Sequence, residues 1–70
     1  MNTQISFAAR SAVSEYRIRR DYSRLERAVS FRDLTAKNSM GETLLDTALR
    51  LGDRKTADAL VRLGAHRTIH

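Results

Sequence analysis

Apolar residues recur at helical spacing along most of the chain, and the clearest case lies in the second half. Thr43 can cap a helix with its hydroxyl, while Asp46, three residues later, can reach back to the amide of the cap. A helix over 44–51 follows, with four apolar residues on one side of it: Leu44, Leu45, Ala48 and Leu49. Gly52 is placed to end this helix in the left-handed conformation that other residues resist.

A further helix over 54–63 begins almost at once. Asp53 can cap it, its apolar positions again follow the i, i+3, i+4 rule, and Gly64 can end it. Two helices joined only by Gly52 and Asp53 must fold back on each other as a tight antiparallel hairpin. The residues predicted to be buried between them are Leu45, Ala48, Leu60 and Val61.

The first forty residues contain no glycine and no proline, so helices are favoured over strands there as well. The pattern predicts helices over 5–18 and 22–31, with Asp21 as the cap of the second. One continuous helix over 3–31 remains an alternative, because an apolar stripe crosses the boundary at i, i+4, i+7 and i+11: Ile18, Tyr22, Leu25 and Val29. The predicted fold is all-α, with about four helices in two helix-turn-helix hairpins.

Residues 38–66 contain a Gly-x-Thr-Leu-Leu-Asp-x-Ala opening from Gly41 to Ala48 and a Leu-Val-x-Leu-Gly-Ala close from Leu60 to Ala65. This pattern resembles one full ankyrin repeat. The family usually opens with Gly-x-Thr-Pro-Leu-His-x-Ala and closes with Leu-Leu-x-x-Gly-Ala. Leu44 stands where the family has proline, and Asp46 stands where it has histidine. The residues that carry the resemblance are Asn38, Gly41, Thr43, Leu45, Ala48, Gly52, Leu60, Val61, Leu63, Gly64 and Ala65.

The resemblance implies an organisation for the whole chain. Residues 1–32 are expected to form an atypical first repeat, 33–43 a loop like the ankyrin finger, 44–66 the clear repeat and 67–70 a tail. Members of the family bind proteins through the finger and the inner helix. Carried over by position, the expected partner-binding residues are Lys37, Asn38, Ser39, Met40, Glu42, Asp46, Thr47 and Arg50.

The formal net charge is +5, and most of it belongs to the first half. Residues 1–37 hold eight basic and four acidic side chains, whereas residues 38–70 hold five and four. A basic patch is therefore expected at Arg17, Arg20, Arg24 and Arg27. Nucleic-acid binding is the alternative function, although a DNA-reading helix-turn-helix needs apolar residues where Asp53 and Asp58 stand.

No arrangement of residues points to catalysis, and neither a cofactor nor a metal is expected. There is no cysteine and no glycine-rich phosphate loop, and the carboxylates are scattered. His66 and His70 are four residues apart, but two imidazoles without a third ligand seldom make a zinc site. The absence of a basic start and of a long apolar run favours a cytoplasmic protein with no membrane contact. Eleven arginines against two lysines hint at a GC-rich bacterial or phage genome.

A chain of 70 residues has a small core, and no disulfide is available to stabilise it. The stripe of Ile18, Tyr22, Leu25 and Val29 carries more apolar surface than one hairpin of small residues can cover. We therefore expect a homodimer through this stripe. The predicted function is that of a small inhibitor, adaptor or regulator that binds another protein.

Overall fold

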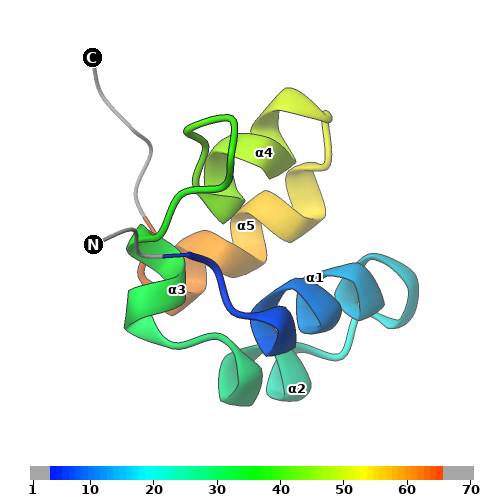
Figure 1. Cartoon of the computed structure of the whole chain (residues 1–70). Helices are drawn as coiled ribbons and strands as arrows, with labels where there is room; N and C mark the ends of the chain where they lie inside the picture. The colour runs from blue at the N-terminus through cyan, green and yellow to red at the C-terminus, as the bar shows by residue number, and fades with distance from the viewer. Residues whose placement is uncertain (1–3, 66–70) are drawn as a thin grey trace.

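The computed structural model describes residues 4–65, and this part of the chain is all-helical, which confirms the predicted fold class (Figure 1). Two longer helices each pair with a neighbour, and a short helix connects the two pairs. The elements are α1 (Phe7–Arg19), α2 (Tyr22–Ala28), α3 (Phe31–Thr35), α4 (Leu44–Arg50) and α5 (Arg54–Leu63).

The helices are arranged as two hairpins with a common core. α1 packs against α2, α4 packs against α5, and the hairpins meet where α1 contacts α5 and where α3 contacts α4 (Figure 1). Leu25, Leu45 and Leu60 are the largest apolar side chains that are fully buried, one from each of α2, α4 and α5. α1 contributes Ala9 and Ala12, whose small side chains allow its backbone to approach the other helices closely.

Every helix begins at a side chain that caps it. Ser6, Asp21, Ser30, Thr43 and Asp53 each accept a hydrogen bond from the backbone N–H three residues later. Such caps satisfy amides that have no partner inside the helix. The caps expected at Asp21, Thr43 and Asp53 are thus confirmed, including the reciprocal bond from the Thr43 amide to the Asp46 carboxylate.

The first half contains a break that rules out one continuous helix over 3–31. Arg20 adopts a left-handed conformation, with φ of 59°, and its amide bonds to the carbonyl of Tyr16. Asp21 then caps α2 in an extended conformation. Because Ile18 precedes this break and Tyr22 follows it, the apolar stripe does not continue along one helix.

The second helix ends earlier than predicted, and the loop begins later. α2 stops at Ala28 because Val29 and Ser30 are extended, and Ser30 starts α3 with a capping box completed by Asp33. The predicted helix over 22–31 is therefore two helices. Residues 33–35, assigned to the finger loop, belong to α3, and the loop runs over 36–43.

The predicted core is confirmed at three of its four positions. Leu45, Ala48 and Leu60 are buried, but Val61 is 54% exposed. The reason is the phase of α5, whose buried arc is centred on Thr56 and Leu60 rather than on Val61. Leu49, expected on the apolar side of α4, is also exposed.

The predicted dimer interface is wrong, because most of the stripe is buried within the single chain. Leu25 and Val29 are buried in the core of the single chain, and Tyr22 is partly buried under the guanidinium of Arg62. Only Ile18, which is 81% exposed, is free to meet another molecule. The four residues therefore do not form one surface.

Gly52 occupies the left-handed position predicted for it, with φ of 74°, and open space surrounds the site of a Cβ. Gly52→Ala should therefore lower the free energy of unfolding by about 1 kcal/mol through backbone strain alone. Gly52→Asn should lower it less, because asparagine tolerates this conformation better. Urea unfolding followed by circular dichroism measures both, and an alanine variant as stable as the parent would contradict the assigned turn.

Candidate functional site

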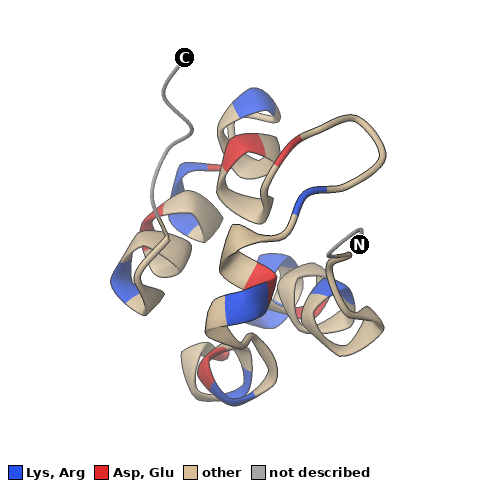
Figure 2. Cartoon of the chain, turned by 60° about the vertical axis from the view of Figure 1, so that its left-hand side comes forward, with Lys and Arg blue, Asp and Glu red and all other residues tan. Residues whose placement is uncertain are grey.

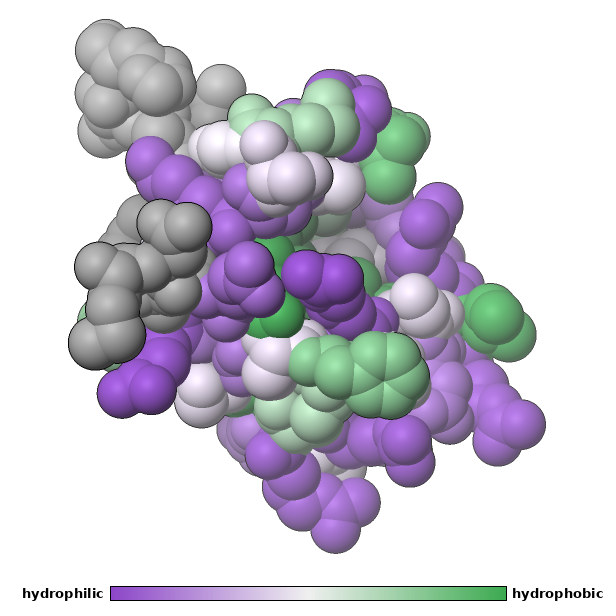
Figure 3. All heavy atoms as spheres, viewed as in Figure 1, coloured by the Kyte–Doolittle hydropathy of each residue, from purple (hydrophilic) through white to green (hydrophobic). Residues whose placement is uncertain are grey.

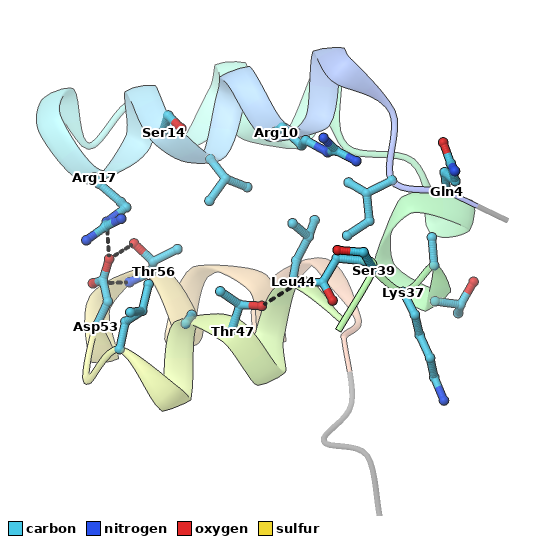
Figure 4. Close-up of a pocket in the computed structure, with 17 residues that line it drawn as sticks. Gln4, Arg10, Ser14, Arg17, Lys37, Ser39, Leu44, Thr47, Asp53 and Thr56 are labelled. Carbon is cyan, nitrogen blue, oxygen red and sulfur yellow. Dashed lines mark hydrogen bonds and ion pairs between the residues drawn. The ribbon is translucent and has the colours of Figure 1, made fainter. Parts of the chain in front are cut away.

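A groove of about 960 Å³ lies between α1 and α4 (Figure 4). The two helices run in the same direction on opposite sides of the groove, with Arg10 across from Leu44 at one end and Arg17 near Asp53 at the other. Each wall repeats the i, i+3, i+4, i+7 spacing of a single helix face. The wall residues are Arg10, Val13, Ser14 and Arg17 on α1, and Leu44, Thr47 and Ala48 on α4 with Leu51 just after it.

The groove has apolar side chains at its base, with uncharged polar and charged side chains around them. Ile5 and Ala48 are buried in it, Val13 and Leu44 are partly buried against the core, and Leu51 is half exposed. Figure 3 shows apolar atoms in the hollow between the two hairpins, with hydrophilic side chains around it. The charged side chains that line the groove are Arg10, Arg17, Lys37 and Asp53.

One end of the groove is closed by a bridge between α1 and α5. The Nε of Arg17 lies 3.1 Å from Oδ2 of Asp53, which also accepts a hydrogen bond of 2.6 Å from the Thr56 hydroxyl. The Thr56 hydroxyl is the main reason that the pKa of Asp53 lies below its ordinary value. Burial opposes this effect, while the Thr56 amide and the charges of Arg17 and Arg20 add to it. Asp53 therefore stays ionised and holds Arg17 at the rim.

The other end of the groove is bounded by the loop that follows α3. Asn38 closes this loop, because its Oδ1 accepts hydrogen bonds from the amides of Met40 and Glu42 at 2.9 and 3.0 Å. The Asn38 amide donates to the Glu42 carbonyl at 2.8 Å, and Gly41, with φ of 78°, completes the turn. Lys37 and Ser39 line the groove from this loop.

Most of the predicted partner-binding residues bond to one another. The Glu42 carboxylate accepts hydrogen bonds from the Thr47 hydroxyl at 3.3 Å and from Nε of Arg50 at 2.9 Å, and Asn38 donates to Thr47 at 3.5 Å. The bond from Arg50 is the main cause of the lowered pKa of Glu42. These contacts fasten the loop to α4, and Asp46 caps that helix.

Only part of the predicted partner-binding set borders the groove. Lys37, Asn38, Ser39 and Thr47 line it, whereas Met40, Glu42, Asp46 and Arg50 do not. Met40 is exposed on the loop outside it. The α1 wall is absent from the predicted set, although its spacing of Arg10, Val13, Ser14 and Arg17 was a usable signal.

The predicted basic patch is partly neutralised within the chain. Arg17 pairs with Asp53, Arg24 lies 2.7 Å from the Glu15 carboxylate, and Arg20 lies over the Tyr16 ring. Arg27 is exposed. Basic residues are spread over all five helices, and each helix also carries an acidic residue (Figure 2). None of the five helices is purely basic.

Asp33 is a buried carboxylate that the sequence pattern placed in a loop. Its Oδ1 accepts the Ser6 amide at 2.9 Å, and its Oδ2 accepts both the amide and the hydroxyl of Ser30 at 3.0 Å. Burial raises the pKa of Asp33, but the hydrogen bonds from Ser30 and Ser6 outweigh burial and bring the pKa below its ordinary value. The ionised carboxylate joins the starts of α1 and α3, and so fixes the α1 wall relative to the loop.

Over residues 4–65, no group of three or more histidine, cysteine, aspartate or glutamate side chains could hold a metal ion. His66 and His70 lie outside the described residues. No described helix combines the length and apolar character required to cross a membrane.

Comparison with protein-family models, with curated proteins and with solved structures finds no significant match to this chain. The groove is therefore the feature on which the proposed function depends.

Proposed function

We propose that this chain is a protein-binding module that receives a segment of another protein in the groove between α1 and α4. The observation that carries the proposal is a groove of about 960 Å³ that the chain itself leaves open, with apolar side chains at its base and polar side chains around them. Open apolar hollows with a polar rim are typical of binding sites, because covering them removes apolar surface from water.

The polar groups around the groove favour recognition over chemistry. Asp53 is held by Thr56 and Arg17, and Thr47 is held by Glu42 and Asn38. Groups saturated by structural hydrogen bonds shape a surface but are poorly placed to activate a substrate. The groove thus offers shape, apolar contact and charge, which suits an inhibitor, adaptor or regulator that acts by binding.

The likeness to ankyrin repeats stays a prediction. Two helical hairpins, with α1 and α4 on opposite sides of the groove and a loop fastened to the second hairpin, are compatible with it. Self-association also stays a prediction, and it now depends on the exposed side chains of Phe7, Ile18 and Phe31 rather than on the stripe.

The proposed function is tested by capture from a bacterial lysate with two matched variants. Leu51 lines the groove and is 51% exposed, whereas Leu49 is 41% exposed and lies outside it. Leu51→Glu should reduce capture of the partner by about tenfold or more, because a carboxylate would be buried in the interface. Leu49→Glu makes the same change in side chain and should leave capture unchanged.

Mass spectrometry of the recovered material decides the outcome. Partner recovery that depends on Leu51 and not on Leu49 supports the groove. Equal recovery by both variants, or loss of recovery by Leu49→Glu alone, would place the binding surface elsewhere and contradict the proposal.

Nucleic acid should bind weakly and lose its affinity as salt increases. Arg17, Arg24 and Arg50 already pair with carboxylates of the same chain, which reduces the number of arginines available to neutralise phosphates. Fluorescence anisotropy with a labelled DNA duplex should give a Kd above about 10 μM at physiological salt, within the range of non-specific binding. Sub-micromolar binding there would favour the nucleic-acid alternative.

A further inference from the structure

The charge on the rim of the groove is unbalanced. Three cationic residues line it, Arg10, Arg17 and Lys37, against one anionic residue, Asp53, which gives a net charge of +2 from three minus one. Asp53 is already neutralised by Arg17. Arg10 and Lys37 are exposed and form no ion pair with any residue of 4–65. An occupant with carboxylates would therefore complement the rim.

The cations lie at both ends of the groove. Arg10 and Arg17 are seven residues apart on α1, a rise of about 10 Å or two helical turns. Lys37 lies at the Arg10 end, near Gln4, with its ammonium directed away from the groove, and Asp53 holds Arg17 at the opposite end (Figure 4). A guanidinium has five N–H donors, so the contact from Nε of Arg17 to Asp53 does not exhaust its capacity. The side chain of Arg17 is 51% exposed.

The α1 and α4 walls of the groove have a spacing of residues against which a partner helix can pack. Two helix faces on opposite sides of the groove, each with residues at i, i+3, i+4 and i+7, present ridges and grooves against which a third helix can pack. Val13, Leu44 and Leu51 supply the apolar contacts along this length. A helix laid between them would meet the cations at its two ends and the apolar side chains in its middle.

We propose that the groove binds an amphipathic helix of a partner protein, with its apolar stripe against Val13, Leu44 and Leu51. Carboxylates about two turns apart on that helix pair with Arg10 at one end and with Arg17 at the other. This inference rests on the proposed function and specifies the chemistry of the partner.

Two other occupants fit the groove less well. A nucleic acid would satisfy the cations but would leave the apolar interior without a matching surface. A second copy of this chain would bring its exposed Ile18 into the groove, but Arg17, Arg19 and Arg20 surround that residue in the sequence. Those arginines would face the cationic rim, and like charges across an interface oppose association.

The test is a selection from a displayed library of helical peptides. The apolar positions are fixed at i, i+3, i+4 and i+7, and the flanking positions vary among Glu, Gln and Lys. Selection on the intact chain should enrich Glu over Lys by about tenfold or more at flanking positions two turns apart. Selection on Arg10→Glu should remove the preference for Glu at one end, and selection on Arg27→Glu should leave it unchanged.

Arg27 is a matched control because it is an exposed arginine of α2 outside the groove, and its replacement changes the net charge equally. Circular dichroism establishes that both variants are folded. Enrichment of Lys or Gln, the absence of any enriched peptide, or an equal response to the two substitutions would overturn the acidic-helix inference.

The failure of this inference can be told apart from the failure of the proposed function. If lysate capture depends on Leu51 and not on Leu49 while the selection favours no carboxylates, the groove binds proteins of another chemistry. If capture is independent of Leu51, the groove is not the binding site, whatever the selection enriches.

Discussion

Leu60→Ala should lower the free energy of unfolding by about 2 to 5 kcal/mol, the range for deleting most of a buried leucine side chain. Leu60 is fully buried where α5 meets the core, so its removal leaves a cavity lined by other apolar side chains. A chain of this length is stable by only about 3 to 10 kcal/mol. A large part of its stability therefore depends on this one side chain, and urea unfolding followed by circular dichroism measures the loss.

Val61→Ala is the matched control on the same helix. Val61 is 54% exposed, so its truncation removes few contacts and should change the free energy of unfolding by about 0.5 kcal/mol or less. Equal losses at positions 60 and 61 would mean that α5 is rotated relative to the core described above.

Asp33→Ala should lower the free energy of unfolding by about 2 to 3 kcal/mol, because hydrogen bonds to a charged group are strong and their loss leaves donors unsatisfied. The donors are the Ser6 amide and the amide and hydroxyl of Ser30. Water can reach part of this site, so the loss should be smaller than three separate hydrogen bonds would suggest. Asp58→Ala, at an exposed carboxylate of α5, should change stability by about 0.5 kcal/mol or less.

The contribution of Asp33 also has a defined pH dependence. Its pKa in the folded chain is lowered from the ordinary value of 3.8, so the unfolded chain binds the proton more readily. The stabilisation is present above the ordinary pKa and is lost as the pH falls through the lowered one. Acid unfolding of the parent should be steeper than that of Asp33→Ala. Some acid sensitivity should remain, because the pKa of Asp53 is lowered as well. Identical acid profiles would contradict the assigned hydrogen bonds.

The parts of the fold that depend on neighbours in the sequence could be predicted. Thr43 with Asp46, Asp53 and Gly52 act within one turn of the chain, and each has the conformation expected of it. The start of α3 has a similar local signal, since Ser30 and Asp33 have the spacing of Thr43 and Asp46. Apolar residues on both sides of Ser30 favoured a continuous helix instead, and that interpretation was wrong.

The parts that depend on distant segments could not be predicted. The Asp33 carboxylate bonds to Ser6, 27 residues earlier, and no local pattern indicates this contact. Thr56 is buried with its amide and hydroxyl bonded to Asp53, on the side of α5 that faces the core, and Val61 is exposed. The groove itself is set by the separation of α1 and α4, which the packing of other helices determines. For this reason the sequence indicated Lys37, Asn38 and Ser39 of the loop and Thr47 of α4, but not the α1 wall.

The groove between α1 and α4 is the proposed binding site. Amide chemical-shift mapping of the isotope-labelled chain, titrated with the partner recovered from the lysate, tests it most directly. The largest changes in amide chemical shift should fall on residues 10–17 of α1 and 44–51 at α4, with small changes along α2. Largest shifts on α2 and on the exposed side of α5, with the groove residues unchanged, would contradict it.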